Sequence, residues 1–186
     1  MHLAHLALTN FRTFRQLELD LQPGLHVLTS GNAFGKTNFL EGITLLATTR
    51  SFRAARDADM IAWKAIQDDP LPAASLSAKV ETAGDPVTLD VAIIGSASQR
   101  VTTNGTALKA SSRRFRVNGV ARRASDLIGH LRVVVFGADD LDIIAGPPSG
   151  RRRYLDITIS QFDPAYVRAL RRYNRVLQQR NSLLRR

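Results

Sequence analysis

Residues 25–48 read LHVLTSGNAFGKTNFLEGITLLAT, and this stretch decides the fold. The apolar run at 25–28 predicts a short buried strand, and residues 36–48 carry apolar side chains at helical spacing. The glycine-containing loop between them would place backbone N–H groups and a helix N-terminus around one concavity, which favours phosphate. The predicted phosphate-binding residues are Ser30, Gly31, Asn32, Ala33, Phe34, Gly35, Lys36 and Thr37.

Three of these residues have a defined chemical role. Gly35 lets the backbone approach the phosphates, the Lys36 ammonium reaches the β and γ groups, and the Thr37 hydroxyl is a ligand for Mg²⁺. A bare Gly-Lys-Thr is more often a turn before an ordinary helix. Here it follows an apolar strand and opens an apolar-patterned helix, so we expect phosphate binding.

The loop departs from the strict pattern G-x-x-x-x-G-K-[ST] at its first position. Ser30 stands where the first glycine belongs, and Gly31 follows one residue late. Because most of the cradle is backbone, we expect binding to survive with weakened affinity.

Outside this stretch, apolar and polar residues alternate at the period of strands. The predicted strands are 2–10 and 16–21, which turn at FRTFR, then 75–83, 86–95 and a buried strand at 133–136. Asn118-Gly119 is the strongest signal for a two-residue hairpin turn. Asp163 and Pro164 predict the start of an arginine-laced helix that runs to the last residue.

The net charge of +10 is concentrated in two segments. Residues 99–132 carry 8 basic and 1 acidic side chains, and residues 151–186 carry 10 and 2. Arginine suits phosphate, so we expect at least one of these segments to meet a polyanion. The DNA-binding candidates are Arg113, Arg114, Arg116, Arg122 and Arg123 near the predicted turn, and Arg151, Arg152 and Arg153 at a helix start.

Each basic group has an alternative explanation. Arginines at a hairpin edge also serve to prevent aggregation, and the two interpretations carry equal weight. For Arg151, Arg152 and Arg153 the alternative is an ordinary helix start with exposed arginines. Arginine is electrostatically unfavourable at a helix N-terminus, however, and this suggests an anionic neighbour.

Composition excludes several classes of protein. The sequence has no cysteine, so disulfides and thiolate metal sites are excluded. Its start lacks the pattern of a signal peptide, and no apolar run approaches the roughly 18 residues of a membrane span. We expect a cytoplasmic protein that does not enter a membrane.

Five blocks, taken in order, resemble the RecF family over nearly the whole chain. They are LTNFRTF, NAFGKTNFLEGI, TTRSFR, LIGHLRVVVFGADDLDIIAGPPSGRRRYLD and DPAYVRALRRYNRVLQQRN. The first two resemble the related heads of structural-maintenance-of-chromosomes (SMC) proteins as well. The GPPSGRRRYLD block and the helix after it are similar to RecF specifically.

The resemblance implies the N-terminal half of an α/β P-loop ATPase head of the ABC/SMC type. A mixed sheet would surround the phosphate-loop helix, beside an antiparallel hairpin layer and the start of a helical lobe. The expected division is an ATPase head at 1–160 and the first helix of the lobe at 161–186. ATP and Mg²⁺ would bind at the loop, with Arg12 as a candidate contact to the nucleotide phosphates.

The same resemblance implies a biological role. It suggests an ATP-dependent homodimer that binds DNA at single-stranded gaps or at single-stranded/double-stranded junctions. RecO and RecR would be its partners in loading RecA, and the full-length protein would be a weak ATPase.

Parts of the family pattern are changed or missing. Besides the loop change, Phe34, Gly42 and Ala138 differ from the residues that the family usually carries there. The Walker B carboxylate and the signature motif are absent, so the catalytic residues are unknown. Asp139, Asp140 and Asp142 follow the predicted strand at 133–136, and we interpret them as a polar strand exit.

Two other functions are compatible with the sequence. A DNA-binding or interaction module with a degenerate loop is favoured by Ser30. A P-loop phosphotransferase would need a lid and an acceptor pocket, and the long arginine-rich helix argues against both.

Overall fold

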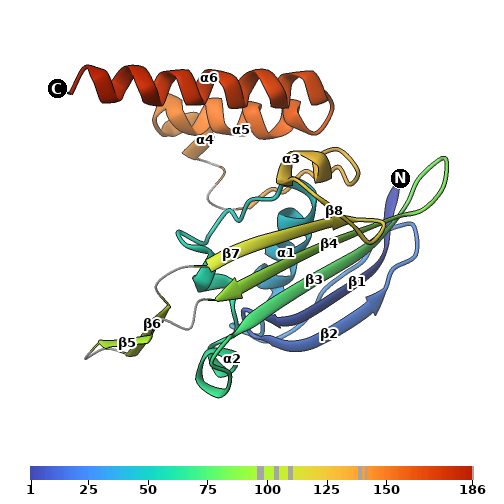
Figure 1. Ribbon diagram of the computed structural model, residues 1–186. Coiled ribbons are helices and arrows are strands. Elements are labelled where there is room, and N and C mark those ends of the chain that lie inside the picture. The colour runs from blue at the N-terminus through green and yellow to red at the C-terminus, as the bar shows by residue number, and fades with distance from the viewer. Residues whose placement is uncertain (96–98, 103–104, 109–110, 138–139, 141, 186) are drawn as a thin grey trace. The chain divides into compact units, whose positions relative to one another are not determined.

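The computed structural model describes residues 1–95, 99–102, 105–108, 111–137, 140 and 142–185 (Figure 1). It divides into two compact units, Met1–Val133 and Val134–Arg186. The first unit contains a sheet and the helix after the glycine loop, and the second contains helices. The expected boundary at 160/161 lies inside the second unit, where one helix ends and the next begins.

A six-stranded sheet forms the first unit, with the order β2-β1-β3-β4-β7-β8 and antiparallel pairing throughout. The predicted first hairpin and the two strands after it are confirmed. Asn118 and Gly119, with φ of 50° and 76°, make the predicted turn. The strands are β1 (His2–Phe11), β2 (Phe14–Asp20), β3 (Ala73–Glu81), β4 (Val87–Gly95), β7 (Ser111–Val117) and β8 (Val120–Arg122), and β5 (Gln99–Thr102) pairs separately with β6 (Gly105–Leu108).

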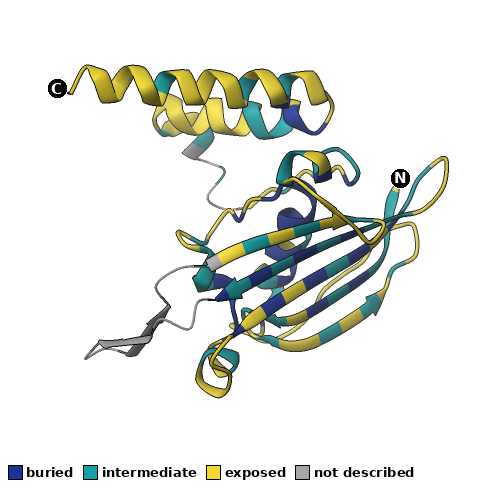
Figure 2. Ribbon diagram, in the orientation of Figure 1, coloured by how far each residue is buried: buried dark blue, intermediate teal, exposed yellow. Residues whose placement is uncertain are grey.

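One face of the sheet is buried under α1 (Lys36–Thr48), as predicted. Buried and exposed residues alternate along the strands, because successive side chains point to opposite faces (Figure 2). Leu8 and Leu76 of the sheet belong to the same buried core as Leu45 and Leu46 of the helix. Gly42 allows the close approach, since a Cβ there would lie 3.1 Å from Leu8 Cδ2.

Short helices complete the first unit, and the described residues of the second unit form three helices. They are η1 (Asp57–Met60), α2 (Trp63–Asp68) and α3 (Ala124–Leu127), followed by α4 (Asp142–Ala145), α5 (Pro148–Ser160) and α6 (Pro164–Leu183). Asp163 caps α6 as predicted, because its carboxylate accepts from Ala165 N at 2.7 Å. Tyr166 of α6 donates to Asp156 of α5 at 2.6 Å, and this hydrogen bond raises the pKa of Tyr166. None of the helices that the structure describes is long and apolar enough to cross a membrane.

The predictions of buried strands at 25–28 and 133–136 are wrong. Neither segment forms a strand, and side chains in both are exposed: Leu25 by 92% and Phe136 by 81%. A strand needs a neighbour for its backbone hydrogen bonds and a covering layer for its faces. Among the described residues, no strand pairs with either segment, so their apolar character alone does not make them strands.

Arg113 joins three elements of the first unit. It lies on the inward side of β7, and its guanidinium forms a two-point ion pair with Asp57 of η1. It also donates to the carbonyl of Thr49, which ends α1, at 2.5 Å. This side chain therefore holds both ends of the loop that follows α1.

We predict that Arg113→Ala lowers the free energy of unfolding by about 1.5–3 kcal/mol, the usual contribution of hydrogen bonds to charged groups. Arg114→Ala is the matched control, because its side chain is on the exposed face of the same strand. It should change stability by less than about 0.5 kcal/mol. Urea titration followed through Trp63, the one tryptophan, reports on the first unit. Equal losses for the two variants would contradict the assigned role.

Candidate functional site

The loop before α1 has the backbone geometry of an anion cradle. Ala33 and Gly35 have φ of 67° and 96°, and Gly35 is the N-cap of α1. Alternating left-handed and right-handed residues turn successive N–H groups to one side, and the helix N-terminus adds positive potential. Only glycine fits at position 35, since a Cβ would lie 2.7 Å from Thr13 Oγ1.

The Lys36 ammonium lies inside this loop and contacts its first residues. It donates to the carbonyls of Ser30 at 2.7 Å and Gly31 at 2.8 Å, and to the Ser30 hydroxyl at 3.1 Å. Ser30 therefore adds a side-chain acceptor for the lysine that a glycine would lack. The exposed ring of Phe34 lies against Gly31, so two departures from the usual loop are in contact.

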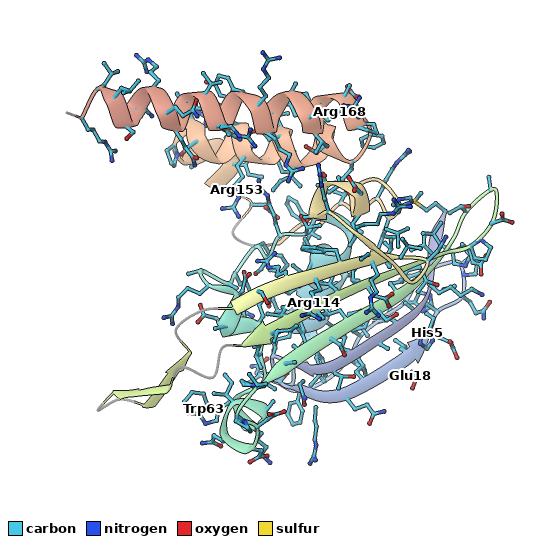
Figure 3. The ribbon with its side chains drawn as sticks, viewed as in Figure 1. His5, Glu18, Trp63, Arg114, Arg153 and Arg168 are labelled. Atoms are coloured by element: carbon cyan, nitrogen blue, oxygen red, sulfur yellow. The ribbon has the colours of Figure 1, made fainter. Side chains whose placement is uncertain are left out.

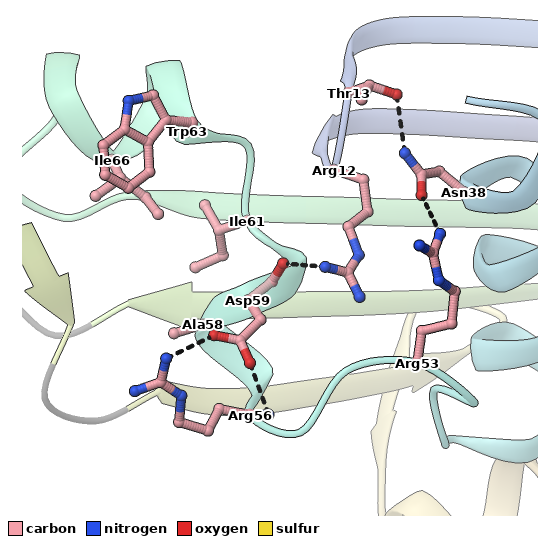
Figure 4. Close-up of a pocket in the computed structure, with 10 residues that line it drawn as sticks. All are labelled: Arg12, Thr13, Asn38, Arg53, Arg56, Ala58, Asp59, Ile61, Trp63 and Ile66. Carbon is pink, nitrogen blue, oxygen red and sulfur yellow. Dashed lines mark hydrogen bonds and ion pairs between the residues drawn. The ribbon is translucent and has the colours of Figure 1, made fainter. Parts of the chain in front are cut away.

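Two pockets adjoin along the start of α1. The first, of about 390 Å³, is lined by the loop and by Asn38 and Arg53. The second, of about 400 Å³, shares Asn38 and Arg53 and adds the apolar side chains of Ile61, Trp63 and Ile66 (Figure 4). The remaining lining residues of the second pocket are Arg12, Thr13, Arg56, Ala58 and Asp59. A loop with the geometry of an anion cradle therefore lies beside a partly apolar pocket.

Arg12 lies in the wall of the second pocket and is held by protein groups. Its backbone has φ of 54°, a strained value for an arginine, and its N–H donates to Met60 O at 2.8 Å. The guanidinium donates to both oxygens of Glu41, at 2.8 and 3.0 Å, and to Asp59 O at 2.6 Å. Its expected contact with nucleotide phosphates stays a prediction.

Glu41, a fully buried carboxylate, was not predicted as a residue of this site. The pattern contained a signal, because positions 41, 45 and 48 share one face of a helix and Leu45 and Thr48 are buried there. Besides Arg12, the Ser51 hydroxyl donates to Glu41 at 2.5 Å. Both carboxylate oxygens of Glu41 thus accept hydrogen bonds from protein groups.

Magnesium ligands are few among the described residues. Thr37 is exposed at the start of α1, as the phosphate-loop assignment requires. The described part of the chain contains no group of three His, Cys, Asp or Glu side chains able to hold a metal ion. Asp140 accepts from Gly137 N at 2.6 Å in a turn, Asp142 begins α4, and Asp139 lies outside the described residues.

The alternation of β7 separates the arginines of the hairpin. Arg114 and Arg116 lie on the exposed face of the sheet, whereas Arg113 faces the other way toward Asp57 (Figure 3 labels Arg114). Asp90 lies opposite Arg116 in the register and reduces the positive potential there. The exposed face of β7 therefore carries fewer arginines, and less positive charge, than the sequence predicted.

The other two hairpin arginines lie outside this face. Arg122 is opposite Phe115 in the register, on the same side of the sheet as Arg113, and is exposed at the edge strand. Arg123 is the exposed N-cap of α3, and its backbone N–H donates to Asp126 at 3.3 Å.

Of the three arginines in α5, Arg151 has partners within its own unit. Its guanidinium donates to the carbonyls of residues 143, 144 and 146, at 3.1–3.2 Å, where α4 ends. Carbonyl groups at a helix C-terminus are a favourable neighbour for a cation. Arg152 and Arg153 are exposed on α5, and Figure 3 labels Arg153.

Comparison with known proteins agrees with this geometry. The family model described as "AAA domain" matches residues 5–119, which is more than half of the chain. The DNA replication and repair protein RecF of Chloroflexus aurantiacus is 45% identical over all of this chain and 46% of its own length. The RecF protein of Halalkalibacterium halodurans is 35% identical over 99% of this chain and 44% of its own. The chain thus spans less than half the length of the curated relatives it matches.

Solved structures give the same result. The recombination mediator protein RecF-ATPrS of the RecFOR pathway superposes with a TM-score of 0.79 at 29% identity, over 99% of this chain and 45% of that one. The Smc head domain of Pyrococcus furiosus, with a TM-score of 0.57 at 19% identity, covers 98% of this chain and 49% of that one and shares the fold. The predicted fold class, a P-loop ATPase head of the ABC/SMC type, is confirmed. The chain therefore belongs to the AAA-domain family, and it is similar to RecF proteins over somewhat less than half of their length.

Proposed function

We propose that this chain binds ATP with Mg²⁺ at the loop 30–37 and acts in a DNA-binding ATPase of replication and repair. The observation that carries the proposal is the Lys36 ammonium inside a loop that ends at the N-terminus of α1. A cation, oriented N–H groups and a helix dipole favour a polyphosphate together. The relatives named RecF and the solved RecF-ATP structure support the same nucleotide.

The adjoining pocket supports a nucleoside and not phosphate alone. Its wall contains Ile61, Trp63 and Ile66, which offer apolar and aromatic contact to a base, and Trp63 is 55% exposed. Asn38 and Arg53 line both pockets, so a single ligand can extend from one to the other. We assign the loop to the phosphates and the second pocket to the base and sugar.

Thr37 would hold Mg²⁺ through its hydroxyl, and the ion would offset the negative charge of the phosphates. The acidic side chain nearest in sequence, Glu41, is occupied by Arg12 and Ser51. Asp59, the carboxylate that lines the second pocket, pairs with Arg56. Hydrolysis would therefore need a further carboxylate that is free of such partners. We expect the chain alone to bind ATP without useful turnover.

We predict that Lys36→Met weakens ATP binding by at least about tenfold, because it removes hydrogen bonds from a cation to the phosphates. Isothermal titration with ATP and Mg²⁺ measures the effect. Lys64→Met is the matched control, since Lys64 is an exposed lysine of α2. Equal affinity of the Lys36 variant and the parent would refute the assigned phosphate site.

A second prediction distinguishes contacts to the base of ATP from contacts to its phosphates. Trp63→Ala should weaken ATP binding by roughly tenfold, as expected from the loss of base–aromatic stacking. The same variant should bind inorganic tripolyphosphate as the parent does, because the loop is unchanged. If both ligands lose affinity equally, Trp63 does not contact the base.

The proposed DNA role rests on charge. The two basic segments hold 18 of the 26 basic residues, and exposed arginines remain on β7 and α5 after Arg113 and Arg151, which bond to groups of their own units, are set aside. We propose that they contact the DNA backbone, at single-stranded gaps or junctions, in an ATP-dependent dimer. RecO and RecR are the proposed partners, and the support is the similarity of this chain to a solved RecF protein of the RecFOR pathway.

For DNA, the prediction concerns the salt dependence of binding. Each phosphate contact contributes about 0.9 to the log–log slope on duplex DNA, so replacing Arg114 and Arg116 with glutamine should flatten it by up to about 2. Arg113→Gln should lower stability but leave the slope unchanged, because its guanidinium is held by Asp57. Affinity for a gapped duplex across a salt series tests both. An unchanged slope in the double variant would show that the exposed face of β7 is not used.

A further inference from the structure

Ser51 ties the loop after α1 to the buried carboxylate of the helix. Its hydroxyl donates to Glu41 Oε1 at 2.5 Å and accepts from the backbone N–H groups of Arg53 at 2.9 Å and Ala54 at 2.7 Å. Ser51 is 8% exposed and Glu41 is fully buried. One hydroxyl therefore fixes the backbone conformation of the loop at Arg53 and Ala54.

The side chain of Arg53 lies at the boundary between the two pockets. Its guanidinium donates to Asn38 Oδ1 at 3.2 Å, and Asn38 Nδ2 donates to Thr13 Oγ1 at 3.0 Å. Figure 4 shows Arg53, Asn38 and Thr13 in one line across the site, from the loop, the helix and the hairpin turn. The guanidinium thus stays near the ligand space and is bonded to a neutral amide, not to a carboxylate.

We propose that Ser51 and Glu41 are positioning residues for nucleotide binding, which hold Arg53 where its guanidinium contacts the phosphates of the bound nucleotide. This inference rests on the proposed ATP site. An arginine on a mobile loop would lose much conformational freedom on binding, and a loop that is already fixed avoids most of that loss. A carboxylate at position 41 is suited to the task because Arg12 holds it in place from the other side.

Ser51 is the better residue to change. Replacing Glu41 would leave the Arg12 guanidinium without its carboxylate partner in a largely buried site. The resulting loss of stability would obscure any effect on ATP binding. Ser51→Ala removes one hydroxyl, whereas Ser51→Thr keeps a hydroxyl at the same branch point.

A double-mutant cycle on ATP affinity, measured by titration calorimetry on the whole chain, tests this positioning role. Ser51→Ala should weaken ATP binding by about tenfold and Arg53→Ala by at least as much. In the Arg53→Ala background, Ser51→Ala should have little further effect, because the two changes remove the same contact. Ser51→Thr should stay within about twofold of the parent.

A structural readout accompanies the titration. The amides of Arg53 and Ala54 should exchange faster with deuterium in Ser51→Ala and at the parental rate in Ser51→Thr. Additive losses in the cycle, or parental affinity and exchange in Ser51→Ala, overturn the positioning role. If the parent itself binds no ATP, the proposed function fails and the role in binding fails with it. Faster exchange in Ser51→Ala identifies that outcome as a failure of the ATP site and not of the hydrogen bonds to Ser51.

Discussion

The burial of the Glu41 carboxylate is the constraint on which the site depends. A charge removed from water costs several kcal/mol unless it is paired and hydrogen-bonded, so Glu41 needs both Arg12 and Ser51. Arg12 belongs to the turn of the first hairpin, and Ser51 to the loop after α1. One carboxylate therefore fixes the helix that starts at the phosphate loop relative to both walls of the second pocket.

Elements defined by neighbours in sequence were predictable. The α1 helix, the first hairpin, the Asn118-Gly119 turn and the Asp163 cap depend on local pattern, and all of them form as expected. The segments at 25–28 and 133–136 were not predictable, because a strand also needs a partner that its own residues do not specify. Glu41 was missed because its partners lie 29 and 10 residues away, and no local pattern names them.

Charge counts predicted the basic segments but not the environment of each arginine. Arg113 and Arg151 bond to groups within their own units, although Arg151 is exposed, as are Arg114, Arg116, Arg152 and Arg153. Sequence treats these side chains alike, since the difference arises from the face of a strand or from a carbonyl at the end of another helix. The contribution of each arginine to DNA binding therefore depends on its own contacts in the folded chain.

The alternation along β7 also limits how this segment can change. Deleting one residue within the strand would exchange its faces beyond that point, and would turn Arg116 into the core and Val117 out to solvent. A deletion before position 113 would also break the ion pair between Arg113 and Asp57. The fold therefore fixes the length of β7 and the residues of its inner face, whereas the residues of its outer face are constrained by the proposed contact with DNA and not by packing.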